Sequence, residues 1–244
     1  MNSRQVLIAA ALCFPVTCRA QETNIPPLKS EPHHHLVFHN SYVNVYSVEV
    51  QPHDSVQLHR HEADGIGIML SNSEITVRAP GKSDLHQNVT NGQLRLQTAG
   101  YVHSTYIDGD TPYRNVTVEL LATQRSPQNL CATIIAAQPT HCPPPKPNPD
   151  GRTEQPQFQT DQTGITLIRI SPGQSVTLDA PARPQLLVIL DEAEGATGNS
   201  SLTSLRAGDF LWRDANSAAQ VFRNASPGEV RVVAFTFKDE KSAK

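Results

Sequence analysis

The chain has no long hydrophobic run beyond its first twenty residues, and it has no excess of basic residues. Its 20 Lys and Arg residues are outnumbered by 23 Asp and Glu residues, which gives a formal net charge of −3. The first absence excludes a membrane span in the rest of the chain, because a span needs about 20 apolar residues. The second excludes the basic stripe of a nucleic-acid-binding surface, so nucleic acid is not an expected partner.

The first twenty residues have the pattern of a secretory signal peptide. Arg4 supplies the positive start, an apolar run extends from Val6 to Val16, and Cys18 and Ala20 place small residues at the −3 and −1 positions of a cleavage site. A short membrane anchor is the alternative, but the run is too short to span a bilayer. The sequence therefore predicts a signal peptide over residues 1–20 and a secreted or periplasmic protein with no membrane association after cleavage.

Cysteine is scarce as well. The chain has four, and Cys131 and Cys142 are the two that follow the predicted signal peptide. No Cys-x-x-Cys pair is present and only His141 is adjacent, which disfavours a zinc site at these residues. An exported chain meets an oxidising compartment, so a Cys131–Cys142 disulfide is the prediction and two free thiols are the alternative.

Histidine is the residue that carries the most information. His59 and His61 are two residues apart in a segment with the alternation of a strand, so both side chains project from one face of a sheet. His103, on another strand, would complete a facial set of imidazoles and leave coordination positions open. The prediction is one divalent transition metal, with no residue that selects among Fe, Mn, Zn, Ni and Cu. The alternative is that the histidines only pack.

The order of these residues resembles the cupin family. Cupins carry a His-x-His motif followed by a glutamate, and then a glycine, a turn and a further histidine. Here His59 and His61 match the first motif, while Gly92, Gly100 and His103 match the second with the family's spacing. Thr98 replaces the turn proline. The resemblance covers about residues 40 to 122 and implies a jelly-roll barrel with a metal site.

The carboxylate ligand of that pattern is missing. Gly65 or Ile66 occupies the position of the usual glutamate, and Asp64 lies one residue early. Asp64 is therefore a candidate fourth ligand, which would require a bulge that shifts the phase of its strand. Otherwise it lies in the turn after His61.

A second histidine cluster precedes the first. Consecutive strand residues alternate faces, so His33, His34 and His35 do not easily share one ion. These residues and His39 are predicted to form a polar entry strand, with metal scavenging or capping of the barrel as the alternative.

The chain divides into two related halves. Residues 139 to 156 hold seven of the 19 prolines, which is typical of a stiff spacer. The expected domains are a signal peptide over 1–20, an N-terminal barrel with the metal site over 21–137, a linker over 138–158 and a degenerate barrel over 159–244. Residues 52–70 align with 172–190 without a gap, which indicates an internal repeat.

In that alignment the second half has lost the ligand residues. Asp179 stands at His59, Pro181 at His61 and Ala219 at His103, and the chain has no histidine after His141. The second half keeps apolar runs such as residues 186–190 and 230–235. We therefore expect it to pack against the first barrel as the second subunit of a cupin homodimer would.

Many short, β-rich segments bounded by Gly, Pro, Asn or Asp predict an all-β protein. With the resemblance, the fold class is two cupin jelly-roll β-barrels in tandem, a bicupin. Helix signals are weak, and residues 127–137 are compatible with either a short helix or a strand.

The function implied by the resemblance is metal-dependent chemistry on a small organic substrate, of the dioxygenase, isomerase or decarboxylase kind. The alternative is a non-catalytic cupin that binds a small ligand or the metal itself, because a fold does not decide a function. The expected partner is a small molecule, and the sequence leaves homo-oligomerisation and the substrate open.

Overall fold

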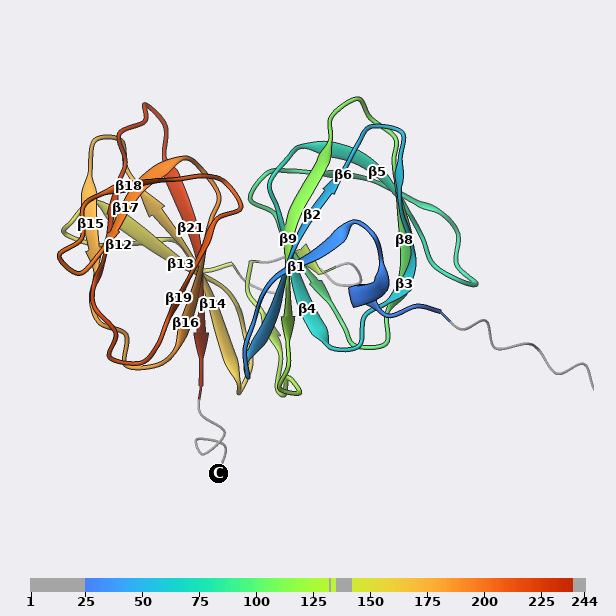
Figure 1. Ribbon diagram of the computed structural model, residues 1–244, viewed down its shortest axis with the longest axis horizontal. Coiled ribbons are helices and arrows are strands. Elements are labelled where there is room, and N and C mark those ends of the chain that lie inside the picture. The colour runs from blue at the N-terminus through green and yellow to red at the C-terminus, as the bar shows by residue number, and fades with distance from the viewer. Residues whose placement is uncertain (1–24, 132, 135–141, 239–244) are drawn as a thin grey trace, which may run out of the picture.

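The computed structural model describes residues 25–131, 133–134 and 142–238, and the predicted signal peptide lies outside this part of the chain. The described residues form two β-barrels that lie side by side (Figure 1). Their one helical segment is the three-residue 3₁₀ turn η1, Leu28–Ser30, so none of the described helices could cross a membrane. The predicted all-β fold class is confirmed.

Each barrel is built from one large and one small sheet. In the first barrel, the six-stranded sheet has the order β1 (His34–His39), β2 (Val43–Val50), β9 (Tyr113–Leu120), β4 (Asp64–Met69), β7 (Leu94–Gln97) and β11 (Thr133–Ile134). The four-stranded sheet facing it has the order β3 (Ser55–Arg60), β8 (Val102–Ile107), β5 (Ser73–Arg78) and β6 (Leu85–Val89).

The second barrel repeats this plan. Its large sheet has the order β10 (Gln128–Asn129), β13 (Arg152–Gln159), β14 (Thr163–Ile170), β21 (Val230–Phe237), β16 (Gln185–Ile189) and β19 (Phe210–Arg213), with β12 (Lys146–Pro147) beside β13. Its small sheet has the order β15 (Ser175–Leu178), β20 (Gln220–Arg223), β17 (Ala193–Thr197) and β18 (Thr203–Leu205).

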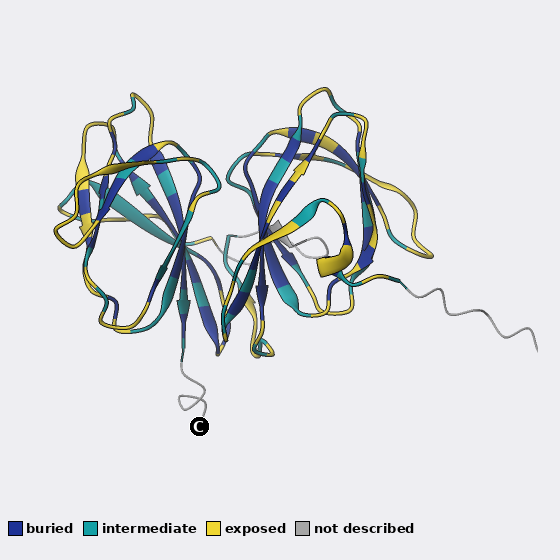
Figure 2. Cartoon of the chain, viewed as in Figure 1, coloured by how far each residue is buried: buried dark blue, intermediate teal, exposed yellow. Residues whose placement is uncertain are grey.

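The two large sheets pack face to face, which explains the apolar runs of the second half. In β21, Val232 and Ala234 point into the second barrel, while Val233 and Phe235 belong to a separate cluster shared with the first barrel. Both faces of the strand are thus buried, and alternation with polar residues is lost. The dark blue strands at the centre of Figure 2 lie along this contact. The predicted packing of the two barrels is confirmed.

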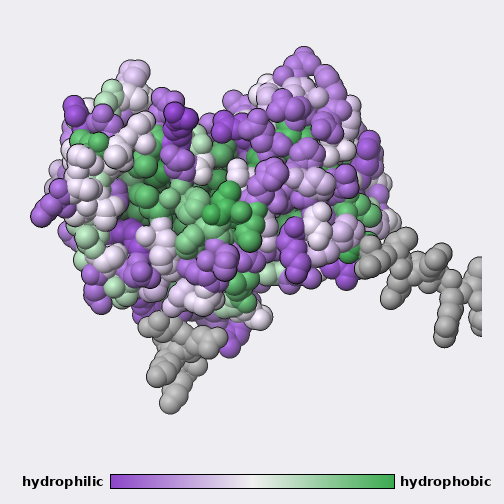
Figure 3. Space-filling view, in the orientation of Figure 1, coloured by the Kyte–Doolittle hydropathy of each residue, from purple (hydrophilic) through white to green (hydrophobic). Residues whose placement is uncertain are grey.

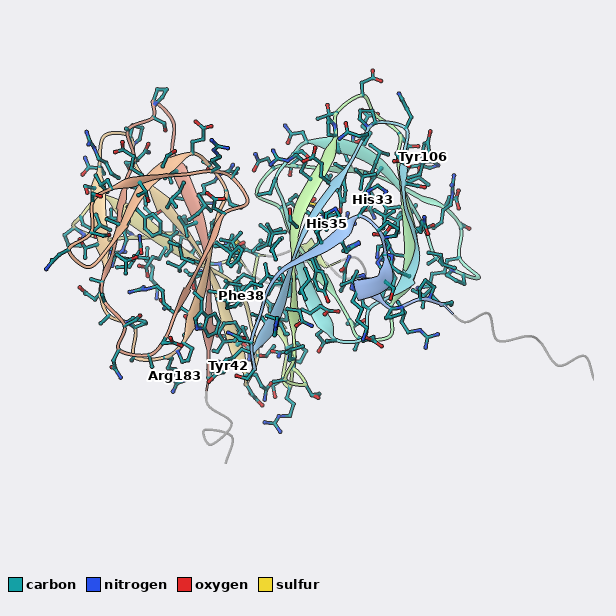
Figure 4. All side chains as sticks on the ribbon, in the orientation of Figure 1. His33, His35, Phe38, Tyr42, Tyr106 and Arg183 are labelled. Carbon is teal, nitrogen blue, oxygen red and sulfur yellow. A yellow bond between two sulfur atoms is a disulfide. The ribbon has the colours of Figure 1, made fainter. Side chains whose placement is uncertain are left out.

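Aromatic residues close one edge of the contact between the barrels. Phe38 and Tyr42 of the first barrel lie at the boundary with the second (Figure 4). The ring of Phe38 is 5.8 Å from that of Trp212, and the ring of Tyr42 is 5.3 Å from that of Phe237, centre to centre. The hydrophobic surface that Figure 3 shows between the barrels is the outer rim of this contact.

The predicted linker, residues 138–158, is wrong at its C-terminal end. Residues 152–159 form β13, which pairs with β14 along its length and with β12 and β10 at its two ends. Pro156 lies between those short pairings and next to a bulge in the β13–β14 register. A proline is tolerated at such a position because its missing N–H breaks no ladder bond, so proline content did not prevent a strand.

The boundary between the barrels is also less sharp than a linker implies. The described part of residues 127–137 contains two short strands: β10 joins the large sheet of the second barrel, and β11 pairs with β7 of the first. The Sγ atoms of Cys131 and Cys142 are bonded to each other, as predicted. The disulfide therefore lies where the chain passes from one barrel to the other.

Candidate metal centre

Two neighbouring strands of the small sheet bring the three predicted histidines together. His59 on β3 is the cross-strand partner of His103 on β8. His61 follows β3, where its backbone N–H donates to Tyr101 and its carbonyl accepts from Gly100. Gly100 has a φ of +82°, which the turn between β7 and β8 requires. All three side chains are buried inside the first barrel.

The three imidazoles converge through the same nitrogen. The Nε2 atom of His61 lies 3.2 Å from Nε2 of His59 and 3.0 Å from Nε2 of His103. Two nitrogens bound to one ion at about 2.0–2.1 Å, at octahedral or tetrahedral angles, are about 2.9–3.4 Å apart. The spacing therefore fits three cis ligands of a single transition metal.

The hydrogen bonds around the rings support this fit. The Nδ1 atom of His59 lies 2.8 Å from the carbonyl of Gln57, which can only accept, so the proton is on Nδ1 and the Nε2 lone pair faces the other rings. One N–H on Nε2 of His61 could donate to His59 or to His103, but not to both. Nδ1 of His61 is buried without a partner. The ring nitrogens do not satisfy one another, whereas a shared cation would accept all three lone pairs.

Burial keeps these rings neutral. It lowers the pKa of His59 to about 4 and that of His61 to about 3, and it lowers the pKa of His103 well below the ordinary value. Electrostatic repulsion from the neighbouring histidines further lowers the pKa of His61 and of His103. At neutral pH all three imidazoles are neutral, which is the form that binds a metal.

The structure does not bring Asp64 to the histidines. Asp64 begins β4, and its Oδ1 accepts a hydrogen bond of 2.9 Å from the backbone N–H of Ala99. Among the described residues, the metal-capable group contains the three histidines alone. The required bulge lies in β3, between Val56 and His59, rather than at Asp64. Asp64 therefore fixes the turn after β7 and is outside the candidate centre.

Sequence reasoning missed Glu31 and the role of His34. Glu31 is 3% exposed, and its Oε2 lies 2.7 Å from Nδ1 of His34. The ring of His34 in turn lies 5.0 Å from that of His59, centre to centre. His33 and His35, labelled in Figure 4, lie on either side of His34 on the entry segment, so only one of the three adjacent histidines reaches the site. The Glu-x-x-His spacing was the available signal.

Glu31 also positions His59 through the backbone of Gln57. Its Oε1 accepts the backbone N–H of Gln57 at 2.9 Å, and the carbonyl of Gln57 accepts from His59. Burial raises the pKa of Glu31, but the hydrogen bonds from His34 and Gln57 outweigh it, so the net pKa is lowered. Glu31 is thus a charged buried residue that orients the first histidine ligand.

We expect Glu31→Gln to weaken metal binding about 10-fold, because outer partners of ligating histidines typically contribute 10–100-fold. It should also cost about 1–3 kcal/mol of stability at neutral pH. A carboxyl group whose pKa is lower in the folded than in the unfolded chain stabilises the fold at any pH above its unfolded-state pKa. This stabilisation is lost as the pH falls through the pKa of the folded state. The stability gap between variant and wild type should therefore close in acid. Metal titration and urea denaturation measure both effects.

The matched control is Glu49→Gln, which removes an exposed carboxylate of the same barrel. An equal loss of metal affinity in both variants would refute the positioning role of Glu31.

The second barrel has a buried arginine side chain at the corresponding place. Alignment of Gly92 with Gly208 puts Arg213 of β19 opposite Gln97 of β7. The Nη2 atom of Arg213 donates to the carbonyls of Asp179, Leu178 and Ala218 at 2.6, 3.1 and 3.4 Å. Asp179 stands at the position of His59, so a buried guanidinium occupies the region of the lost ligands and is held by backbone oxygens.

Comparison with known proteins identifies the fold but not a sequence family. No protein-family model and no curated protein sequence matches the chain. AerE from Microcystis aeruginosa matches with a TM-score of 0.61 and 15% identity, over 88% of this chain and 98% of that one. A salicylate 1,2-dioxygenase variant from Pseudoaminobacter salicylatoxidans matches with a TM-score of 0.56 and 11% identity, over 80% and 71%.

Oxalate decarboxylase from Bacillus subtilis, whose Mn(II) centres have been characterised, matches with a TM-score of 0.53 and 11% identity, over 82% and 70%. These are cupin-family proteins, and they include a dioxygenase and a decarboxylase with Mn(II) centres. The chain therefore has the bicupin fold, with a three-histidine site in its first barrel that could bind a metal.

Proposed function

We propose that this protein is an exported, mononuclear metal-dependent enzyme, of the dioxygenase or isomerase kind, that transforms a small organic substrate in its first barrel. The convergence of the three Nε2 atoms, 3.0 and 3.2 Å apart, carries the proposal. Export rests on the N-terminal sequence pattern and agrees with the Cys131–Cys142 disulfide.

In such a site, some residues of the chain would hold the ion and others would position the residues that hold it. His59, His61 and His103 would hold a divalent transition ion, and Glu31 and His34 would keep the first ligand in place. An ion held by three neutral imidazoles keeps open positions and supplies Lewis-acid or redox chemistry. The apolar side chains that line the adjoining cavity, Val56, Met69 and Val77, exclude bulk water from it.

The alternative is a non-catalytic protein that binds a small ligand at the metal. A specific observation favours it: the cavity beside His103 has a volume of only about 20 Å³, close to the space of one water molecule. A substrate larger than this must enter by displacing side chains or reach the ion from the open end of the barrel.

Elemental analysis followed by oxygen uptake separates these functions. Protein purified from an oxidising compartment is loaded in turn with Fe(II), Mn(II), Zn(II), Ni(II) and Cu(II), and then assayed with small organic acids and phenols. We expect one ion per chain and substrate-dependent oxygen consumption with a redox-active ion. One ion per chain without turnover of any tested substrate would favour the binding protein. The absence of any stoichiometric metal would refute both.

A further inference from the structure

Three charged side chains are buried in the first barrel: Glu31, Glu119 and Arg95. Glu31 is paired with His34, and Glu119 accepts hydrogen bonds from Asn44 and Tyr46, whereas the metal proposal gives Arg95 no role. Arg95 is in the middle of β7, on the large sheet, and is only 5% exposed. Its side chain spans the barrel, because its Nη2 donates to the side-chain oxygen of Gln87 on β6 of the small sheet. Arg95 and His103 line the same cavity.

The guanidinium of Arg95 is not neutralised by the chain. Its Nε atom is buried without a hydrogen-bond partner, and no carboxylate in the described residues forms an ion pair with it. The other polar side chains around the cavity carry no formal negative charge: they are His34, Gln97, His103, Thr105, Tyr113, Asn115 and Thr117. Arg95 is thus a buried positive charge that faces a cavity with one donor free.

Such an arrangement is costly unless a ligand completes it. An arginine stays charged at any physiological pH, so it cannot lose its proton to escape burial. Burying an ion without a partner of opposite charge costs several kcal/mol of desolvation. Arg213 differs in its Nη2 atom, which donates to three backbone carbonyls, although its Nε, like that of Arg95, is buried without a hydrogen-bond partner among the described residues. Arg95 donates to one side-chain acceptor, Gln87, and lines the cavity.

The metal proposal strengthens the case for an anion. A divalent ion at the three histidines and the guanidinium of Arg95 would place two positive centres beside one low-dielectric cavity, where they repel each other. A single anion between them would relieve that repulsion and satisfy the free Nε–H. The planar, forked guanidinium matches the planar geometry of a carboxylate, which can accept two parallel hydrogen bonds from it.

We propose that Arg95 anchors the carboxylate of a small organic acid, whose head group lies in the cavity between β7 and His103. This inference rests on the proposed function for the identity of the reacting centre, but the anion site itself depends only on Arg95 and its cavity. Arg95 is then the residue that selects carboxylates over uncharged analogues. Gly67, opposite Arg95 on β4, also lines this cavity and contributes no side chain to it.

Ligand-observed NMR titration with acetate tests the site in metal-free and zinc-loaded protein. We expect acetate to bind wild type, and Arg95→Leu and Arg95→Gln to weaken it at least 10-fold. Arg78→Leu is the matched control: it removes an exposed arginine of the same barrel, paired with Asp84, and should leave acetate binding unchanged. Acetamide, which lacks the charge, should bind at least 10-fold more weakly than acetate.

A second variant tests the cavity without removing the charge. A Cβ at position 67 would lie 3.1 Å from Cε of Met69, so Gly67→Val should fill the space and weaken acetate binding at least 10-fold. Circular dichroism confirms that each variant is folded. If Arg95→Leu does not fold, Arg95→Gln and Gly67→Val decide the question.

The results separate this inference from the metal proposal. If wild type binds acetate but no metal, the carboxylate site is supported and the metal proposal fails. If it binds metal but Arg95→Gln binds acetate within twofold of wild type, the carboxylate proposal is overturned and the metal site stands. Phosphate or acetamide binding as tightly as acetate would also overturn the assignment to carboxylates. Tighter acetate binding in the zinc-loaded form would support a shared site, because such coupling is reciprocal.

Discussion

Replacement of His59, His61 and His103 by alanine is expected to abolish stoichiometric metal binding, from one ion per chain to none. The three Nε2 atoms are the converging ligand atoms, and the group has no other metal-capable member among the described residues. His61→Ala alone should lower the affinity roughly 100-fold, since a four-ligand zinc site provides about 10–16 kcal/mol and one ligand about a quarter of it. Elemental analysis after dialysis measures the first effect, and competition with a chelator measures the second.

The matched control replaces three other histidines, His35, His39 and His86, all of them exposed. It removes the same number of imidazoles and should retain one ion per chain. Asp64→Asn should leave the metal dissociation constant within twofold, because Asp64 is bonded to Ala99 rather than to the site. Retention of one ion per chain in the His59, His61 and His103 variant would show that the metal is bound elsewhere.

The second large effect concerns the contact between the barrels. A fragment of residues 21–137, with Cys131→Ser to avoid cross-linking, is expected to aggregate or to dimerise. Ten buried side chains of its large sheet belong to the shared core and would lose their cover: Val43, Val45, Ile66, Ile68, Leu70, Leu94, Leu96, Val116, Val118 and Leu120. Burying one such side chain stabilises a fold by about 1.5–3 kcal/mol, so their joint exposure is not sustainable in a monomer.

Size-exclusion chromatography and urea denaturation of the fragment provide the measurement. In the full chain, Phe235→Ala should cost about 3–5 kcal/mol, because Phe235 is fully buried in the shared core. Leu202→Ala, at an exposed leucine of the same barrel, should stay within about 0.5 kcal/mol of wild type. A soluble, monomeric fragment as stable as the whole chain would mean that the barrels are independent.

Local patterns were sufficient to predict the strands and the grouping of the three histidines. Short β-rich segments of the kind that predict an all-β protein, such as Val43–Val50, Ser175–Leu178 and Val230–Phe237, are strands in the structure. Alternation along a strand is a property of the backbone, so His59 and His61 had to share a face once that segment was extended. The glycine spacing before His103 indicated the turn that Gly100 makes.

Local sequence patterns could not predict which residues act across strands. Asp64 was nearest to the expected ligand position in sequence, yet Ala99 is its partner. Glu31 is 28 residues before His59 and reaches it through the backbone of Gln57. Arg95 belongs to no motif in the sequence, and only the folded structure shows that its Nε is buried without a hydrogen-bond partner among the described residues. Proline content likewise misplaced the linker, because strand pairing around Pro156 cannot be seen in composition.

The sequence by itself determined the all-β class, the duplication and the three histidines, because these depend on residue type and on short-range periodicity. The tertiary structure decided which other groups meet them. Register brings His103 opposite His59, the β3 bulge turns the first ligand inward, and the entry segment delivers Glu31 and His34. In the sequence, the packing of the two large sheets is visible only as runs of apolar residues. The structure shows that both faces of these strands are buried. Burial and pairing depend on contacts between distant segments, and those contacts exist only in the folded chain.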